Sequence, residues 1–229
     1  MCGRMAITLP HDAMAQLFAA APANDLPDVP NHNVCPTMRI AVVAAEGEGR
    51  VYRPMRWGLV PPWYKKPTGG PLLINARSET IAEKPAFRAA ARERRCLVPA
   101  SGFYEWERAL GETPLPWYVT RADGAPMVFA AIWQDWGEGP GQGGSRMSTV
   151  AVVTCAANAQ MARIHDRLPV ILEPEDWPLW LGEAGKGAAR LMGPAPDGAL
   201  AMARVGTEVN SSRAVGEGLI LTMEPVNPA

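Results

Sequence analysis

Prolines and glycines interrupt this chain throughout its length, and they constrain its fold more than any other feature. Its 229 residues include 23 prolines and 22 glycines. Proline removes a helical hydrogen bond and clashes with the preceding turn, and glycine weakens the interiors of helices and strands. The chain is therefore expected to form many short elements rather than long helices.

Most of the segments between these breaks alternate apolar and polar residues, which is typical of strands. Strands are predicted at 4–9, 40–45, 51–57, 72–74, 96–98, 103–107, 117–120, 127–133, 147–154 and 170–172, with 40–45 and 51–57 forming a hairpin. Helices are predicted at 12–20, 85–94, 158–164 and 174–181, scattered among the strands. This pattern favours an α+β fold on antiparallel or mixed sheets, in a single domain without a dividing linker.

Composition narrows the class of protein further. Hydrophobic residues make up 48% of the chain and charged residues 20%, which allows a sizeable core. The sequence contains no run of 18 apolar residues and no signal-peptide pattern. We therefore expect no membrane span and a cytoplasmic location. The four cysteines form no CxxC pair, which argues against structural zinc and a disulfide framework. The net charge is −1, so any nucleic-acid contact must come from a local basic cluster.

The N-terminal sequence Met1-Cys2-Gly3-Arg4 places a cysteine directly behind the initiator methionine. Removal of Met1 would give Cys2 an α-amine beside its thiol, with reference pKa values of about 7.7–8.0 and about 8.5. An aldehyde can condense with such an amine to an imine, and the thiol can close on the imine carbon to form a thiazolidine ring. The alternative is an ordinary cysteine that happens to stand second, and four residues leave both interpretations open.

Two further segments carry side chains suited to acid–base chemistry. His165 is followed by Asp166 and Arg167, and a proline at position 169 stiffens the segment. A lone histidine beside an apolar residue is more often structural, but these neighbours favour a functional site. Glu105 lies between aromatic residues on a predicted strand. It either faces solvent or points inward, where desolvation would raise its pKa and suit it to proton transfer.

A third polar segment, 75–80, follows the short buried strand predicted at 72–74. It brings together an amide, a guanidinium and a carboxylate, on Asn75, Arg77 and Glu79. Arginine is well shaped for bidentate contacts with phosphate. A surface ion pair between Arg77 and Glu79 is the alternative interpretation.

Five segments, in family order, resemble the signature blocks of the SOS response-associated peptidase (SRAP) family of abasic-site-processing proteins. They are Met1-Cys2-Gly3-Arg4, Trp57-Gly58-Leu59-Val60-Pro61, Asn75-Ala76-Arg77-Ser78-Glu79-Thr80, the segment 95–106 and His165-Asp166-Arg167-Leu168-Pro169. Shorter matches are Asn33-Val34-Cys35-Pro36-Thr37, Val209-Asn210-Ser211 and Glu217-Gly218-Leu219-Ile220. Departures are small: Leu168 stands where methionine is usual and Cys35 where alanine is usual.

The resemblance implies a single domain, 1–229 with a core at about 2–222, in which twisted antiparallel and mixed sheets form a barrel-like body with flanking helices. It implies covalent trapping of abasic sites in single-stranded DNA, as a thiazolidine crosslink through Cys2 after Met1 removal, in the DNA damage response. It further implies autopeptidase and DNA lyase-like activity in a monomer without metal or cofactor. Its location would be cytoplasmic, or nucleoid-associated in a bacterium.

The same resemblance assigns roles in the reaction residue by residue. Cys2 would form the crosslink, and Asn75 would hold the N-terminal residue or the sugar in register. Glu105 would help to protonate and open the deoxyribose ring, with His165 beside it in proton transfer and later release. All four side chains are expected to line one pocket, because each must reach the same sugar.

Contacts with the rest of the DNA would fall to a second set of residues. Enclosing the DNA backbone with a few arginines would supply affinity despite the slightly negative net charge. The expected phosphate ligands are Arg4, Arg77 and Arg167, with Thr154 as a weaker candidate. A long loop before Asn75 contains Thr68-Gly69-Gly70 and leaves open whether Trp63 or Tyr64 stacks on the DNA.

Three other functions remain open from the sequence. N-terminal-nucleophile amidohydrolases also begin with Met-Cys-Gly, although the likeness covers only positions 1–3 and no asparagine–glycine oxyanion segment matches. A peptidase could use Cys2 and His165, acting at least on Met1. A plain single-strand binder would tolerate the loss of Cys2.

Overall fold

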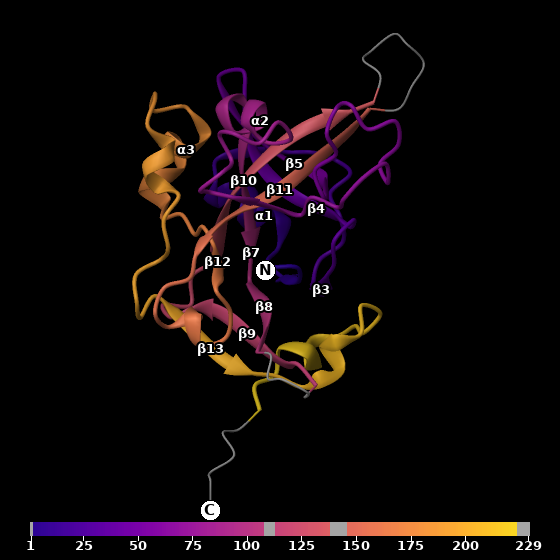
Figure 1. The fold of residues 1–229 in the computed structure, drawn as a ribbon, viewed down its shortest axis with the longest axis vertical. Coiled ribbons are helices and arrows are strands. Elements are labelled where there is room, and N and C mark those ends of the chain that lie inside the picture. Colours follow the sequence, from indigo (N-terminus) through magenta and orange to yellow (C-terminus); the bar gives the residue numbers. More distant parts are fainter. Residues whose placement is uncertain (1, 108–112, 138–145, 224–229) are drawn as a thin grey trace, which may run out of the picture.

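The computed structural model describes residues 2–107, 113–137 and 146–223. Its main body is a closed five-stranded barrel (Figure 1). The barrel consists of β4 (Arg39–Glu46), β5 (Gly49–Trp57), β7 (Arg95–Ala100), β10 (Met127–Trp136) and β11 (Met147–Ala156). Neighbours run antiparallel in the order β11, β10, β7, β4, β5, and a parallel pairing of β11 with β5 closes the ring.

Three short strands extend this sheet. β2 (Ala20–Pro22) runs parallel to β5, whereas β6 (Asn75–Arg77) and β12 (Arg167–Pro169) both pair with β11. β6 continues beyond β5 along one edge of β11, and β12 continues beyond β10 along the other edge. The C-terminal half of β11 therefore holds Asn75, Arg77 and Arg167 in one region of the molecule.

A second sheet of five strands lies at the lower end of the barrel in Figure 1, in the order β13, β9, β8, β1, β3. Its strands are β13 (Leu200–Arg204), β9 (Leu115–Arg121), β8 (Gly102–Glu107), β1 (Met5–Ile7) and β3 (Asn31–Val34). Two 3-10 turns, η4 (Thr207–Asn210) and η5 (Glu217–Ile220), bury Val209 and Leu219 against Tyr104 and Tyr118 of this sheet. Burial of these apolar side chains fixes the C-terminal segment beside the start of the chain.

The helices are short and lie outside the barrel. α2 (Arg88–Glu93) and α3 (Trp177–Leu181) pack against β7, and α1 (His11–Leu17) packs beside β2. The remaining helical turns are of the 3-10 type: η1 (Met161–Arg163), η2 (Pro174–Asp176) and η3 (Ala188–Leu191). None of the helices in the described part of the chain is long and apolar enough to cross a membrane.

The fold class and the hairpin predicted from the sequence are confirmed, since β4 and β5 pair from Arg39 with Arg56 to Glu46 with Gly49. The strand predicted at 72–74 is wrong. Those residues form only an isolated bridge between Leu59 and Leu73, and Leu72 is 49% exposed. The ladder with β11 begins where the Ile74 carbonyl accepts from the Val152 N–H at 3.0 Å, so the strand starts at Asn75.

Three of the four helices were predicted too long, whereas the helix predicted at 174–181 is confirmed as η2 followed directly by α3. α1 ends at Leu17 rather than at 20, and α2 begins at Arg88, three residues after the predicted start. The helix predicted at 158–164 is a 3-10 turn of three residues, Met161–Arg163. Apolar spacing and a proline at the start do not fix length, because short helices depend on tertiary packing for their stability.

Candidate active site

Cys2 lies inside the protein, with only 1% of the residue exposed. The backbone behind it joins the second sheet: the Tyr104 N–H donates to the Arg4 carbonyl at 2.9 Å, and β1 runs antiparallel to β8. Continued toward the N-terminus, this register places Gly3 opposite Glu105 and Cys2 opposite Trp106, one position along β8 from Glu105. The cysteine is thus positioned by strand pairing rather than left on a loose terminus.

A side chain from the other sheet fixes the same residue. The Asn75 amide Nδ2 donates a 2.9 Å hydrogen bond to the Cys2 carbonyl oxygen. Asn75 opens β6, and the pairing of Asn75 with Val152 of β11 sets its position. The hydrogen bond therefore connects the barrel to the N-terminal segment at the cysteine itself.

Burial raises the pKa of the Cys2 thiol well above its usual range, and the negative charge of Glu105 raises it further. A hydrogen bond from the Arg4 backbone N–H acts in the opposite direction but does not offset the burial. The thiol is consequently protonated at neutral pH. The influence of Glu105 also shows that its carboxylate lies within electrostatic reach of the sulfur.

Glu105 points inward and not toward solvent, which decides between the two interpretations that its sequence allowed. Only 4% of the residue is exposed, and β8 is buried continuously from Gly102 to Glu105. The strict alternation of a half-buried strand fails here because both faces of β8 are covered: Phe103 packs in the main core, and Tyr104 packs in a second apolar cluster. The Trp106 N–H donates to Glu105 Oε1 at 3.2 Å and helps to orient the carboxylate.

His165 stands two residues before β12, with 21% of its side chain exposed. Its Nδ1 lies 2.9 Å from the Arg167 backbone N–H and 2.9 Å from Asp166 Oδ1. In the neutral ring Nδ1 accepts from that N–H, which leaves the proton on Nε2, and in the protonated ring Nδ1 faces the Asp166 carboxylate. The histidine therefore has a defined partner in both protonation states.

The segment that carries His165 meets the strands that carry Glu105. A cavity of about 200 Å³ is lined by Glu107 and Trp117 on β8 and β9 and by Arg163 and Ile164, directly before His165. Trp117 is the cross-strand partner of Glu105. The described contacts thus join Cys2, Asn75 and Glu105, and they bring the backbone of the His165 segment to the same sheet.

Arg167 is held in a bidentate ion pair with Glu79, with Nη1 to Oε1 at 2.7 Å and Nη2 to Oε2 at 2.9 Å. Nη2 also donates to the Thr154 carbonyl at 2.8 Å and lies 3.4 Å from its hydroxyl. The hydrogen bonds from Arg167 hold the pKa of Glu79 at about 2. Thr154 has no exposed surface, so it supports Arg167 from below and offers no face to a phosphate.

Arg77 and Arg4 differ in how they could meet DNA. Arg77 is exposed at the end of β6, opposite Thr154, and the suggested pairing with Glu79 is taken by Arg167 instead. Arg4 points into the protein, where Nη1 donates to Asn33 Oδ1 at 2.6 Å and to the Val209 carbonyl at 2.8 Å. Arg4 therefore ties the N-terminal segment to β3 and to the C-terminal turns.

Of the two candidate stacking residues, Trp63 is the accessible one. It is 56% exposed, whereas the Tyr64 ring lies so close to Gly70 that a β-carbon there would be 2.4 Å from it. The Trp136 indole N–H also donates to the Tyr64 carbonyl at 2.8 Å and fixes the loop from below. The two rings meet edge to face at 6.4 Å, so Tyr64 supports Trp63.

Sequence reasoning missed the part played by Asn33 and by the C-terminal turns. Asn33 accepts from Arg4, and its Nδ2 donates to the carbonyls of Ser211 and Ala214 at 3.1 and 2.6 Å. The block from Asn33 to Thr37 and the block at Val209 were visible as family matches, yet nothing in their spacing showed that they meet. In residues 2–107, 113–137 and 146–223, no three His, Cys, Asp or Glu side chains cluster as a metal site.

The chain belongs to the SOS response associated peptidase (SRAP) family, whose model matches residues 1–212.

Several curated proteins are similar over most of the chain. The abasic site processing protein YoqW of Bacillus subtilis is 35% identical over 184 residues, 79% of this chain and 80% of its own. The abasic site processing protein YedK of Escherichia coli is 32% identical over 197 residues, 83% of this chain and 85% of its own. HMCES of Pongo abelii is 29% identical over 221 residues, 77% of this chain and 62% of its own.

Solved structures share the fold. A protein from Bacteroides thetaiotaomicron superposes with a TM-score of 0.80 at 22% identity, covering 92% of this chain and 95% of that one. A protein from Bordetella bronchiseptica superposes with a TM-score of 0.73 at 26% identity, covering 90% and 100%.

Proposed function

We propose that this protein traps abasic sites in single-stranded DNA as a thiazolidine crosslink through Cys2, after Met1 has been removed. The observation that carries the proposal is the fixed position of Cys2: Asn75 binds its carbonyl, and the Glu105 carboxylate lies within electrostatic reach of its thiol. Names of relatives such as YoqW and YedK, which are abasic site processing proteins, support the same substrate.

The order of steps follows from the product. The freed α-amine reacts first, because the imine carbon is the atom on which the Cys2 thiol can close a five-membered ring. It adds to the aldehyde of the ring-opened deoxyribose and expels one water, giving an imine. The thiol then adds across the C=N bond: the sulfur bonds to carbon, and its proton passes to the nitrogen of the new ring.

Acid–base groups are needed before that addition, because the closed sugar hides its aldehyde. Opening breaks the bond between C1 and the ring oxygen, which gains a proton while the hydroxyl on C1 loses one. The buried Glu105 carboxyl group is suited to this transfer, and the His165 imidazole, which the Arg167 N–H orients through Nδ1, is a second acid–base group. Asn75 acts as a positioning residue, because it holds the Cys2 backbone rather than the sugar.

In this proposal the strand is held beside β6 and β12. Arg77, exposed at the end of β6, binds a phosphate directly, and Arg167 offers a second guanidinium that Glu79 and Thr154 orient. Trp63 provides an exposed ring for base stacking, which accepts any sequence. Arg4 orients the N-terminal segment, and any phosphate contact it makes adds to that role.

A general cysteine peptidase is less well supported. The thiolate is the nucleophile in such enzymes, and low thiol pKa values occur in electropositive sites. The Cys2 thiol has the opposite environment, buried and next to a carboxylate. Peptidase activity toward Met1 itself remains a separate proposal, tested by whether Met1 loss requires Glu105 and His165 or an added aminopeptidase.

Mass spectrometry of the Met1-free protein mixed with an abasic single-stranded oligonucleotide tests the main proposal. The adduct mass should equal the sum of the two molecules less one water. Because the imine and the thiazolidine have equal masses, survival of the adduct without borohydride distinguishes the ring. A protein that forms no adduct under these conditions contradicts the proposal.

A further inference from the structure

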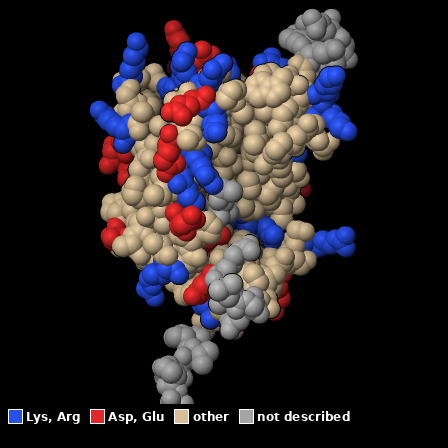
Figure 2. Space-filling model, viewed as in Figure 1, with Lys and Arg blue, Asp and Glu red and all other residues tan. Residues whose placement is uncertain are grey.

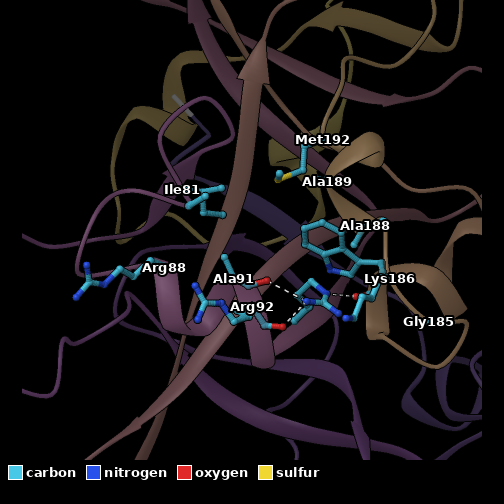
Figure 3. A pocket seen from close by; sticks show the side chains of 13 residues that line it. Ile81, Arg88, Ala91, Arg92, Gly185, Lys186, Ala188, Ala189 and Met192 are labelled. Atoms are coloured by element: carbon cyan, nitrogen blue, oxygen red, sulfur yellow. Dashed lines mark hydrogen bonds between the residues drawn. The ribbon is translucent and has the colours of Figure 1, made fainter.

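A cavity of about 390 Å³ lies on the opposite side of the turn that follows β6, between α2 and the segment from α3 to η3 (Figure 3). It is separate from the residues placed in the reaction above. Ile81 and Ala82 line one wall, α2 lines a second wall through Arg88, Ala91 and Arg92, and residues 185–189 with Met192 line the third.

The floor of the cavity is aliphatic. Ile81 and Ala188 are buried, and the Met192 side chain points toward the cavity beside Ala189 (Figure 3). Trp180 also contributes, but it is only 1% exposed, and its indole N–H donates to the Cys96 carbonyl at 2.9 Å. The Trp180 ring packs in the core, so neither of its faces is available for another ring to stack on.

The rim is basic. Arg88, Arg92 and Lys186 are exposed around the opening, and Figure 2 shows basic side chains gathered over the α2 end of the molecule, with acidic ones between them. Of the residues that line the cavity, all of them described, none is acidic. A concave apolar surface with one sign of charge around it concentrates the electric field on an anionic ligand.

Two of the three acidic side chains nearest the rim in sequence are bound to cations that do not line the cavity, and the third, Glu83, follows Ala82 and is itself followed by Lys84. Glu93 follows Arg92 but is bound to Arg94 at 3.3 Å. Glu183 precedes the loop of Lys186 but is bound to Arg50 at 2.6 Å. The charged residues that line the cavity are therefore all positive, in a protein whose net charge is −1.

The walls of the cavity are joined by a half-buried cation, Arg95. The Arg95 guanidinium donates to the carbonyls of Ala91 and Arg92 at 2.9 and 2.7 Å, and its Nε donates to the Trp180 carbonyl. These bonds, drawn as dashed lines in Figure 3, tie the C-terminal end of α2 to α3. Both walls are fixed before any ligand arrives, which lowers the entropic cost of binding.

We propose that this cavity binds an acidic peptide segment of a partner protein, with one aliphatic side chain on the floor and flanking carboxylates on Arg88, Arg92 and Lys186. The volume suits one anchoring side chain with adjacent backbone. Single-stranded DNA fits less well, because its binding relies on stacking against exposed aromatic rings. The lining residues supply none.

The cavity lies close in the chain to the proposed DNA-binding residues. The chain passes directly from Arg77 at the end of β6, through Glu79, to Ile81 in the cavity wall. A partner docked here is carried next to the proposed DNA-binding site without covering Cys2. Peptide binding and DNA crosslinking are then separable functions of neighbouring surfaces.

The experiment uses fluorescence polarisation of a short labelled peptide in which one central leucine is flanked by aspartates. Matched peptides replace the leucine by alanine or the aspartates by asparagines. The full-length protein is compared with the double variant Arg88→Glu, Lys186→Glu and with Ala189→Trp, which fills the cavity without changing its charge. The single variant Arg88→Glu is added, and Arg213→Glu, at an exposed cation outside the cavity, is its control with the same change in net charge.

The cavity variants and both substituted peptides should weaken binding by about tenfold or more, because burial of one leucine alone is worth about 1.5–3 kcal/mol. Arg213→Glu should bind as the unmodified protein does, and all variants should crosslink abasic DNA at the unmodified rate. Equal binding by Ala189→Trp, or no binding by the unmodified protein, overturns the proposal. If the double variant loses affinity for oligothymidine as strongly as for the peptide, the cavity rim is part of a DNA-binding surface and the peptide proposal is overturned.

Discussion

Asn75 Nδ2 lies 2.9 Å from the carbonyl oxygen of Cys2, and this hydrogen bond joins two residues that are 73 positions apart. Asn75 is fixed by its pairing with β11 of the barrel, whereas Cys2 is fixed by the pairing of β1 with β8 in the second sheet. The reactive terminus is consequently defined by both sheets at once. A reaction that must bring an amine, a thiol and a sugar together gains from such fixed placement.

Asn75→Ala should therefore slow crosslinking by about tenfold or more while leaving affinity for intact single-stranded DNA unchanged, because a small displacement of a reacting group is costly. Loss of one hydrogen bond should lower the free energy of unfolding by only about 1 kcal/mol. Adduct rates and denaturant unfolding of the same sample separate the two effects. An unmodified rate would show that β6 does not set the position of Cys2.

Removal of the thiol should change the kind of adduct rather than prevent all reaction. Cys2→Ala retains an N-terminal amine once Met1 is removed, so it should give an imine that borohydride can trap and no stable ring. Cys2→Ser is the matched control, since its hydroxyl is a much weaker nucleophile than a thiol of the same geometry. If Cys2→Ala forms a stable adduct without borohydride, the adduct is not a thiazolidine and the assignment is wrong.

Glu105→Gln should separate proton transfer from binding. The amide fills the same space and keeps an acceptor for the Trp106 N–H, but it cannot transfer a proton. Crosslinking should slow by about 10²–10⁴-fold with the affinity for intact DNA nearly unchanged. The pair of measurements is decisive: if the rate is unmodified, ring opening does not depend on this carboxylate and His165 becomes the leading acid–base group.

The sequence singles out the candidate site residues, whose roles stay predictions, but it misplaces some of the elements that carry them. The segments around Cys2, Asn75, Glu105 and His165 stood out because each carries unusual chemistry for its surroundings. The strand assigned to 72–74 was displaced by three residues, because apolar character shows what can be buried but not where a partner strand starts. Parallel pairing of β6 with β11 depends on residues far away in the chain and has no local signal.

Side-chain partners were still harder to foresee. The nearest anion to Arg77 in sequence is Glu79, yet Glu79 binds Arg167, 88 positions away. Likewise, the orientation of Glu105 could not be decided from alternation, because both faces of β8 are covered in this fold. Such choices are made by tertiary packing, which overrides the local pattern.

The ion pair of Glu79 with Arg167 gives the protein a pH dependence in acid. Hydrogen bonds from Arg167 lower the pKa of Glu79 to about 2 from an ordinary value of 4.5. A carboxylate with a depressed pKa stabilises the fold above its unfolded value and loses that contribution as pH falls through its folded value. The contribution should thus be present at neutral pH and disappear between about pH 4.5 and pH 2.

Glu79→Gln should remove that part of the acid dependence, so its denaturation midpoint should converge with that of the unmodified protein near pH 2. The difference at neutral pH should be small, since the Glu79 side chain is 49% exposed and solvent screens the pair. Glu208→Gln, at another exposed carboxylate, is the matched control. Parallel curves for Glu79→Gln and the unmodified protein down to pH 2 would contradict the linkage.

Trp63 and Tyr64 are adjacent aromatic residues with different surroundings, which makes them a matched pair for testing how DNA is held. Trp63→Ala should weaken binding to intact oligothymidine by about 1–3 kcal/mol, because each stacked base contributes about that much. Tyr64→Phe keeps the ring beside Gly70 and should leave affinity unchanged. Stacking carries no charge, so the slope of affinity against salt should be the same in both variants, whereas Arg77→Ala should make that slope shallower by about 0.7 in a log–log plot. If Trp63→Ala binds as the unmodified protein does, the exposed ring is not a stacking platform and phosphate contacts alone hold the strand.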